Sequence, residues 1–356
     1  MTHIVVIGAG IVGASLAFHL ARKGANVTIV EAQEIASGVT ANSFAWLNTS
    51  RQGPDPIALL RGVAIGEYHR LQTELPELEI SWTGALCYGA GTDAALQGSS
   101  HASAITQVSR ARILELEPQL KDPPEQALFK SEEGSLDAVH ATHTLIAGAR
   151  DRGAKVLTQT PVIGFRTVNG QVTGVETALE TLDTDVVVIA AGTATQTLTA
   201  MLGTPLPVEA SPSVFIRYHA QPGAIRTLIS SEKMEVRQQP DGTLLAAEDY
   251  QGDAPHNHPS KIAQRTAKAI ESQLHGVRPL VSQMACVGLR PVPADGIPIV
   301  GYLPNVGGVY VCVMHPGVVL AAAVGRLASE ELMDDRVCDE LEPCRPGRFI
   351  QALESP

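Results

Sequence analysis

The sequence predicts an α/β fold in which a parallel sheet is combined with a mainly antiparallel region. Three observations support this. The chain opens with the apolar, β-branched segment 3–7, then a glycine turn, a helical segment at 11–23 and a second apolar segment at 26–30. A further apolar segment, 185–189, ends in another small turn and predicts a strand of the same sheet. Residues 208–250 instead alternate apolar and polar side chains, which indicates antiparallel strands.

The bulk composition predicts a globular protein with a large core. The 356 residues are 44% hydrophobic and 18% charged, which is enough for two domains or one large discontinuous domain. The net charge of −11 disfavours general affinity for nucleic acid or anionic membranes. The apolar stretch 309–327 is interrupted by His315, Pro316 and Arg326, so we expect no membrane span. The apolar start lacks a basic segment before it, and we expect a cytoplasmic protein.

The glycine turn between the first strand and helix has the spacing of a dinucleotide-binding motif. Gly8 allows the tight turn, Gly10 lets a pyrophosphate approach the backbone, and Gly13 lets the helix pack close to the sheet. Glu31 follows the second strand, where it can accept hydrogen bonds from ribose hydroxyls and would repel a 2′-phosphate. The alternative is a glycine-rich turn with no ligand. The motif therefore predicts FAD or NAD rather than NADP.

The other elements follow from periodicity and from turn residues. Asn169 and Gly170 are a strong two-residue turn signal, so residues 162–177 predict a hairpin. Residues 288–301 contain three prolines and predict a rigid, irregular segment. The remaining predictions are helices at 57–75, 101–120 (one helix or two, ending at Pro118), 138–152, 260–275 and 318–332, and strands at 82–88, 153–157 and 308–313.

Two polar features and one aromatic feature have more than one interpretation. The small, polar segment 36–43 is typical of a loop over a cofactor, with Ser37, Thr40 and Ser43 able to bind phosphate, or of an ordinary solvated loop. Trp46, in the aromatic segment 44–48, lines a substrate cavity or belongs to the core. His256 and His258 favour a surface loop over a metal site. The five cysteines form no C-x-x-C pair, so we expect free thiols and no metal centre.

Five blocks of the chain resemble the D-amino acid oxidase and glycine oxidase family of FAD-dependent oxidoreductases. Four are Gly8 to Gly13 with Glu31, the loop from Ser37 to Ser43, residues 134–153 with the following strand, and residues 185–192. The fifth is the most specific: Gly288-Leu-Arg-Pro291, Asp295-Gly-Ile-Pro298, Gly301 and His315-Pro-Gly317. One departure is that the family turn usually holds more glycine than residues 315–319 do.

The resemblance implies a glutathione-reductase-like FAD/NAD(P)-binding fold with two parts. A Rossmann-type FAD-binding domain would contain residues 1–80, 140–205 and 282–356, and a discontinuous, mainly antiparallel substrate-binding domain would contain 81–139 and 206–281. FAD would be bound non-covalently. The residues that the motif and the resemblance place against it are Gly8, Gly10, Ile11, Val12, Gly13, Glu31, Ala32, Ser37, Thr40, Ala41, Asn42, Ser43, Val162, Ala191, Gly192, Gly288, Arg290, His315, Pro316, Gly317, Val318 and Val319.

The resemblance also implies a reaction, with Arg290 and His315 as its catalytic residues. Arg290 would anchor a substrate carboxylate, although a structural salt bridge with a protein acid is the alternative. His315 would contact substrate or flavin, or would be a packed turn residue. The helix after it would direct its N-terminus at the flavin N1/C2=O edge and stabilise negative charge on reduced flavin.

The expected chemistry is oxidation of the C–N bond of an amino acid or related carboxylate-bearing amine. Hydride transfer from the substrate to flavin N5 would give an imine that hydrolyses, with O₂ or another acceptor reoxidising the flavin, and no protein base is required. Two alternatives are an NAD-dependent dehydrogenase and a flavoprotein subunit of a hetero-oligomeric amine dehydrogenase. The sequence leaves the oligomeric state open.

Overall fold

A six-stranded, mostly parallel sheet forms the centre of the computed structural model, which describes residues 1–48, 55–89, 104–277 and 279–349. The strand order is β18-β19-β12-β1-β2-β8, with only β18 antiparallel to its neighbour. The strands are β1 (His3–Ile7), β2 (Asn26–Val30), β8 (Lys155–Leu157), β12 (Val186–Ile189), β18 (Ile299–Tyr302) and β19 (Val309–Val313). The predicted parallel sheet is confirmed, and it gathers strands from both ends of the chain.

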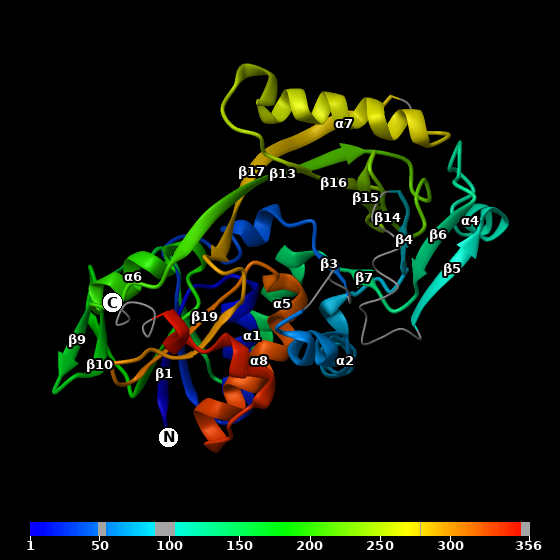
Figure 1. Cartoon of the computed structure of the whole chain (residues 1–356). Helices are drawn as coiled ribbons and strands as arrows, with labels where there is room; N and C mark the ends of the chain where they lie inside the picture. The colour runs from blue at the N-terminus through cyan, green and yellow to red at the C-terminus, as the bar shows by residue number, and fades with distance from the viewer. Residues whose placement is uncertain (49–54, 90–103, 278, 350–356) are drawn as a thin grey trace, which may run out of the picture.

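Both faces of this sheet are covered, which is why its strands are continuously apolar. Ile4 and Val6 of β1 pack toward a helical layer, whereas Val5 and Ile7 pack into a second core on the opposite face. The helical layer holds α1 (Ile11–Arg22), α2 (Ala58–Glu74), α5 (Ala138–Arg150) and α8 (Gly317–Asp334). The opposite face is covered by β9 (Val162–Val168), β10 (Gln171–Thr177), β11 (Thr181–Asp183) and α6 (Thr195–Met201) (Figure 1).

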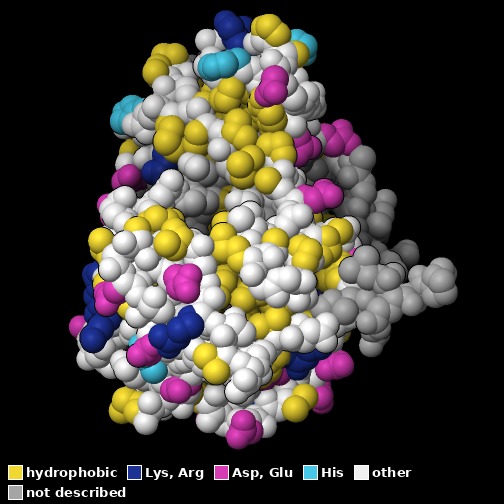
Figure 2. Space-filling model, turned by 90° about the vertical axis from the view of Figure 1, so that its left-hand side faces the viewer, with side chains coloured by type: hydrophobic (Ala, Val, Ile, Leu, Met, Phe, Trp, Pro, Cys, Tyr) yellow, Lys and Arg dark blue, Asp and Glu magenta, His cyan; other side chains and the backbone are white. Residues whose placement is uncertain are grey.

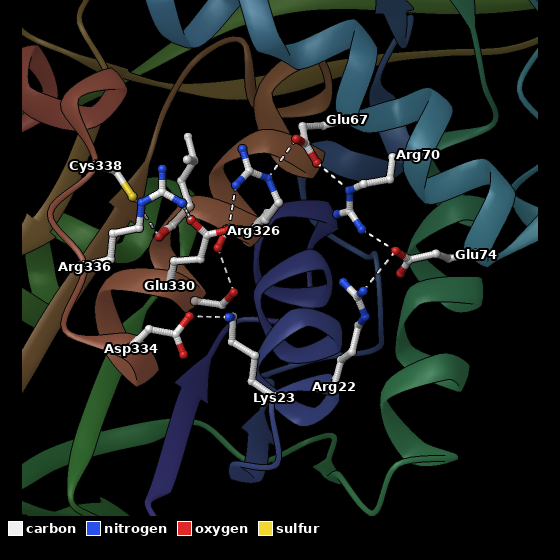
Figure 3. Close-up of polar contacts among 12 residues, drawn as sticks. Arg22, Lys23, Glu67, Arg70, Glu74, Arg326, Glu330, Asp334, Arg336 and Cys338 are labelled. Carbon is white, nitrogen blue, oxygen red and sulfur yellow. Dashed lines mark hydrogen bonds and ion pairs between the residues drawn. The ribbon is translucent and has the colours of Figure 1, made fainter.

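A network of ion pairs ties three helices of the helical layer together (Figure 3). Glu67 of α2 lies 2.7 Å from Arg326 of α8 and 2.8 Å from Arg70 of its own helix. The other pairs are Arg70–Glu74, Arg22–Glu74 (3.2 Å), Lys23–Asp334 (2.5 Å), Arg326–Glu330 (2.6 Å) and Arg336–Glu330 (2.7 Å). Partly exposed pairs contribute little singly, so this network acts chiefly by fixing how α1, α2 and α8 meet.

The second large sheet is mainly antiparallel and has the order β17-β13-β16-β15-β14-β4-β6-β5. Helix α7 (Pro259–Gln273) lies across one face of it at the top of Figure 1 and closes a separate core. The strands are β4 (Ala85–Cys87), β5 (Ile105–Ser109), β6 (Gln126–Lys130), β13 (Val208–His219), β14 (Leu228–Ser230), β15 (Glu235–Gln238), β16 (Leu244–Asp249) and β17 (Val281–Pro293). The α/β fold class with a parallel sheet and an antiparallel region is thus confirmed.

Two predicted segments differ in the structure. Residues 105–109, which we assigned to a helix within 101–120, form β5, and only α4 (Arg110–Leu116) is helical there; residues 101–103 lie outside the described part. Pairing of β5 along the whole of β6 overrides the local helical pattern. The segment at 288–301 is not irregular throughout, because β17 runs to Pro293. Its prolines fit because β17 is an edge strand, where missing N–H donors are tolerated.

Strand β17 links the two domains that the resemblance implies. It falls within the segment 282–356 that we assigned to the cofactor-binding domain, yet it pairs along almost its entire length with β13. By hydrogen bonding it belongs to the antiparallel sheet, and the chain returns to the parallel sheet only at β18. The paired residues lie 62 to 85 positions apart in the chain, and such a pairing leaves no mark on the local pattern, so the sequence did not reveal it.

The remaining short elements complete the described chain. The hairpin predicted at Asn169 and Gly170 is confirmed, with both residues at positive φ (51° and 77°) between β9 and β10. All five cysteines are free, as their spacing predicted. The other elements are β3 (Trp46–Leu47), β7 (Gly134–Ser135) and the 3₁₀ turns Val39–Asn42, Pro76–Leu78, Gly192–Ala194, Pro255–Asn257, Asp339–Cys344 and Pro346–Phe349. No helix in the described ranges has the length and apolar character needed to cross a bilayer.

Candidate active site

A cavity of about 1050 Å³ is bounded by residues of both sheets and of the loops between them. Figure 2 shows one side of the molecule, where hydrophobic side chains gather over the upper part and charged ones are scattered more widely. Most of the predicted site residues line this cavity: Gly8, Gly10, Ile11, Val12, Glu31, Ala32, Ser37, Thr40, Asn42, Ser43, Val162, Ala191, Gly192, Arg290, His315, Pro316, Gly317, Val318 and Val319. Gly13, Ala41 and Gly288 are not part of its wall.

At the glycine turn before α1, backbone segments approach one another too closely for side chains to fit between them. Gly8 has φ of +106°, and a Cβ placed on it would lie 2.5 Å from the carbonyl oxygen of Ala190. A Cβ on Gly13 would lie 2.0 Å from the Gly8 carbonyl oxygen. Gly13 therefore permits the contact between helix and turn, although it does not itself line the cavity.

Glu31 connects the end of β2 to this turn. One carboxylate oxygen accepts a hydrogen bond from the Ala9 N–H at 2.7 Å, and the other accepts one from the Gln33 N–H at 2.9 Å. Each carboxylate oxygen can accept more than one hydrogen bond. Glu31 can therefore hold the turn in place and still accept hydroxyl donors from the cavity side.

The loop after Glu31 is fixed to both neighbouring elements. The Thr40 hydroxyl accepts a hydrogen bond from the Ile11 N–H at 3.2 Å, so it occupies one of the free donors at the start of α1. Asn42 accepts a bond from the Cys286 thiol at 3.0 Å. A Cβ on Gly288 would lie 3.1 Å from the Asn42 Cβ, so Gly288 lets this loop approach β17 without itself reaching the cavity.

The first turns of α1 and α8 border the same cavity. Neither helix is capped by the side chain of its own N-cap residue, which is Gly10 in α1 and Pro316 in α8. The two helices are held together by the Ser15 hydroxyl, which donates to the Ala321 carbonyl at 2.8 Å. Tyr68 of α2 donates to the carbonyl of Val318 in the first turn of α8. Two helix N-termini, each with partial positive charge and free N–H groups, therefore face one space.

The Arg290 guanidinium is oriented by β13 rather than by an acidic partner. Its Nη2 donates to the Ser211 hydroxyl at 3.0 Å, and weaker bonds reach the carbonyls of Ser211 and Pro212 at 3.4 Å. Within the described residues Arg290 forms no ion pair, so the structural salt bridge that we considered is not seen there. The side chain is half-buried and lines the cavity.

His315 lines the cavity, and its side chain is exposed to that space. Burial lowers the pKa of its imidazole, and the positive charges of Arg290 and Arg61 lower that pKa further. His315 is therefore neutral at pH 7. A neutral imidazole can donate one hydrogen bond and accept another without adding positive charge to the site.

Trp46 and two tyrosines, Tyr218 and Tyr250, lie in different places relative to the cavity. Trp46 lines the cavity, and its indole N–H donates at 2.8 Å to the carboxylate of Glu133, which is fully buried. Tyr218 is a core residue whose hydroxyl donates to the Ala263 carbonyl at 2.7 Å. Tyr250 packs at the edge of the same core and contacts Asp253.

Sequence reasoning missed the polar residues that the antiparallel sheet contributes to the cavity. They include Ser213, Glu235 and Asp249, besides Thr193 and Thr197 from the other side. The alternation along 234–239 puts Glu235 and the apolar Val236 on opposite faces of one strand. This alternation was the only local sign that Glu235 could face a cavity. It could not be used alone because the face of a strand that meets a cavity depends on its partners.

Comparison with known proteins identifies the family. Residues 3–331 match the DAO family, described as FAD-dependent oxidoreductases. The oxidoreductase YurR of Bacillus subtilis is 27% identical over 335 residues, which cover 87% of this chain and 88% of that protein. The glycine oxidase of Pseudomonas aeruginosa is 26% identical over 353 residues, covering 94% and 95%. The L-proline dehydrogenase of P. horikoshii has the same fold, with a TM-score of 0.85 at 22% identity, covering 99% of this chain and 98% of that one.

The residues present fit FAD on the geometry of this structure. Gly8 and Gly10 bring backbone without side chains to the cavity wall, and the carboxylate of Glu31 stands beside this turn. The N-termini of α1 and α8 supply N–H donors at two places along one cavity. A dinucleotide offers groups that match this set: ribose hydroxyls for the carboxylate and a pyrophosphate for the helix N-terminus. The chain belongs to the DAO family and is an FAD-dependent oxidoreductase.

Proposed function

We propose that this protein oxidises the carbon–nitrogen bond of an amino acid or a related carboxylate-bearing amine. The observation that carries the proposal is Arg290, a guanidinium that faces the cavity, is fixed by Ser211 and has no acidic partner in the described ranges. Such a group is suited to a planar anion such as a carboxylate. The family supports the same reaction, because two relatives are named for glycine and for L-proline.

The cofactor would be held at both ends by residues already described. Gly8, Gly10 and the start of α1 would receive the pyrophosphate, and Glu31 would bind the adenosine ribose. The first turn of α8, after His315, would receive the negative charge of the reduced ring system. When bound, FAD supplies the two-electron acceptor for the oxidation.

The protein residues would then position the substrate. Arg290 would bind the carboxylate through two parallel N–H donors, which fixes the orientation of the amine-bearing carbon. Neutral His315 would add a hydrogen bond near the same space without competing for the carboxylate charge.

The proposal is tested by anaerobic reduction of the FAD-loaded protein with D-, L- and N-methylated amino acids, each compared with the matching amine that lacks the carboxylate. Replacing Arg290 by Ala should raise KM for the amino acid by about 100-fold and leave the matching amine nearly unchanged. Ser211→Ala is the matched control, because it removes one hydrogen bond to Arg290 but keeps the guanidinium, so its effect should be smaller.

Two outcomes would contradict the proposal. If no amino acid or amine bleaches the bound FAD, the substrate class is wrong. If Arg290→Ala affects the amino acid and the amine equally, Arg290 does not bind the carboxylate. Turnover by the purified chain alone would also separate the proposal from the alternative of a subunit that requires a partner.

A further inference from the structure

The antiparallel sheet presents one face to α7 and the other to the cavity, and strand alternation decides which side chains belong to each. Val214, Val236 and Ala246, on β13, β15 and β16, pack in the core beneath α7. Glu235 precedes Val236 and therefore points to the opposite face. On β13, Ser211 lies three positions from Val214, so its side chain points to the face opposite the α7 core. Arg290 pairs with Ser211 and therefore shares this face with Glu235.

Three carboxylates belong to β15 and β16 in this region, and their positions separate their roles. Glu248 lies on the α7 side, where it accepts a hydrogen bond from the Thr266 hydroxyl at 2.9 Å. Asp249 shares the cavity face but is exposed. Glu235 is the inner carboxylate: it lines the cavity, it is half-buried, and no hydrogen bond or ion pair joins its side chain to another described residue.

The charged groups around Glu235 come from three neighbouring elements. Burial raises the pKa of Glu235 to about 7, the negative charges of Glu248 and Asp249 on β16 raise it as well, and Arg290 on β17 lowers it. Cys87 on β4 also faces Glu235, whose charge contributes to raising the pKa of that thiol. Glu235 is therefore an unpaired acid close enough to Arg290 for the two charges to interact.

An amino acid carries a carboxylate and an ammonium group on the same carbon, so one small molecule can satisfy both residues. We propose that Glu235 binds the α-ammonium group of the substrate and accepts its proton, while Arg290 holds the carboxylate. This inference rests on the proposed function and deepens it. It assigns a proton acceptor that the sequence did not require.

The step is a proton transfer that precedes oxidation. One N–H bond of the ammonium group breaks, and its electron pair stays on nitrogen. The proton forms an O–H bond with Glu235 and later leaves to cavity water. The freed lone pair is the one that forms the carbon–nitrogen double bond of the imine, which is why the amine must be neutral. Because the acid's pKa lies near 7, it can take the proton and release it within one turnover at neutral pH.

The test uses two ligands that cannot be oxidised to an imine. 2-Aminoisobutyrate has the carboxylate and the amine but no α-hydrogen, and isobutyrate lacks the amine. Calorimetric binding to the FAD-loaded protein, in buffers of different ionisation enthalpy, counts the protons exchanged. At pH 7 the wild type should release a fraction of a proton with 2-aminoisobutyrate, because burial raises the pKa of free Glu235 to about 7 and leaves it partly protonated at that pH. It should take up protons with isobutyrate, whose negative charge raises the pKa of Glu235.

Glu235→Gln keeps the shape of the side chain and should remove both proton exchanges. The substitution should weaken the binding of 2-aminoisobutyrate by at least about tenfold. It should leave the binding of isobutyrate unchanged or make it tighter. Glu248→Gln is the matched control: it should keep the preference for the amino ligand while releasing fewer protons at pH 7, because losing a negative neighbour lowers the pKa of Glu235. The FAD spectrum and circular dichroism of each variant report whether it is folded.

A second measurement covers the case in which neither ligand binds measurably. The wild-type kcat/KM for the best amino acid substrate should rise with pH through about 7, and Glu235→Gln should move this rise to the pKa of the free substrate amine. An unchanged pH profile together with an unchanged ligand ratio would overturn the inference. It would also be overturned if Glu235→Gln abolished only the preference for lysine over norleucine, since Glu235 would then bind a distal cation. Neither result touches the Arg290 test, so the two proposals fail separately.

Discussion

The two halves of the cavity are built in different ways. On the cofactor side the structure depends on close contacts between backbone atoms. The Gly8 N–H donates to the Val30 carbonyl at 2.8 Å, and Gly13 packs against the Gly8 carbonyl. On the substrate side it depends on side chains from distant parts of the chain. Arg237 donates to the carbonyls of Phe44 at 2.6 Å and Leu136 at 2.8 Å.

This difference explains what each half tolerates. Backbone contacts at the cofactor side leave no room for added atoms, so the identity of a glycine matters more than any side-chain chemistry. The substrate side presents side chains on a regular sheet, so a change of side chain alters the contacts that it makes and leaves the strand backbone in place. The cofactor half is fixed for one ligand, and the substrate half is where specificity can vary.

The largest expected effect is at Gly13, on the cofactor side. Gly13→Ala would place a Cβ 2.0 Å from the Gly8 carbonyl oxygen, which belongs to the backbone and cannot move aside as a flexible side chain could. We expect loss of FAD binding and a destabilisation of at least about 3 kcal/mol. FAD content after purification and the urea midpoint measure the two effects.

Gly66→Ala is the matched control for the same change in an exposed helix interior. A Cβ on Gly66 of α2 meets nothing within 4 Å. It should stabilise the protein by about 0.5–1 kcal/mol, because alanine favours helix more than glycine does. Similar effects of the two substitutions would show that close backbone packing does not define the cofactor half.

The same difference decides how far the sequence could predict the structure. Gly8, Gly10, Gly13 and Glu31 lie within 24 residues, so their spacing alone indicated one strand–turn–helix–strand unit. The resemblance then placed Arg290 and the turn at His315 in the same site. The cavity does bring those segments together, although their contacts with cofactor and substrate stay predictions.

The substrate side could not be predicted in the same way. Glu235 and Arg290 share a sheet face only through the registers of β15, β16, β13 and β17, which no local pattern records. Trp46 had two equal interpretations, and its contact with Glu133, 87 positions away, places its ring at the cavity. Long-range register and buried polar pairs were the missing information.

The second prediction tests the substrate side through Arg237. Its guanidinium is 4% exposed, and burial lowers its pKa to about 10. Arg237→Met should cost about 3 kcal/mol, because the buried carbonyls of Phe44 and Leu136 lose their donors. It should also raise KM for the substrate while FAD retention stays unchanged, since the cofactor half has no contact with this group among the described bonds.

Arg217→Met is the control for Arg237. Arg217 projects from the same sheet face, but its Nε has no hydrogen-bond partner among the described residues. The cost in unfolding free energy should therefore be smaller. If Arg237→Met lowered FAD affinity as much as it raised KM, the two halves of the cavity would not be independent.

The smallest of these effects concerns His19, a residue of the cofactor half whose contribution depends on side-chain chemistry and not on backbone packing. His19 of α1 is buried, its Nε2 lacks a partner within the described chain, and burial lowers its pKa from 6.5 to about 3, with nearby arginines and Lys23 lowering it further. Because the folded pKa is the lower one, the unfolded chain binds more protons between pH 6.5 and 3. Stability is therefore retained above pH 6.5 and lost as the pH falls below it.

From pH 7 to pH 5 the free energy of unfolding should fall by about 2 kcal/mol on account of His19 alone. His19→Leu should remove this part of the pH dependence and be nearly neutral at pH 7, because the imidazole is already uncharged there. Urea unfolding of both proteins at several pH values measures the difference, with the exposed His256→Gln as control. Parallel pH profiles for wild type and His19→Leu would show that His19 is protonated without unfolding. The stability of the cofactor half would then come from backbone packing and apolar contacts alone. The difference from the substrate side, which depends on polar side chains, would be larger than described above.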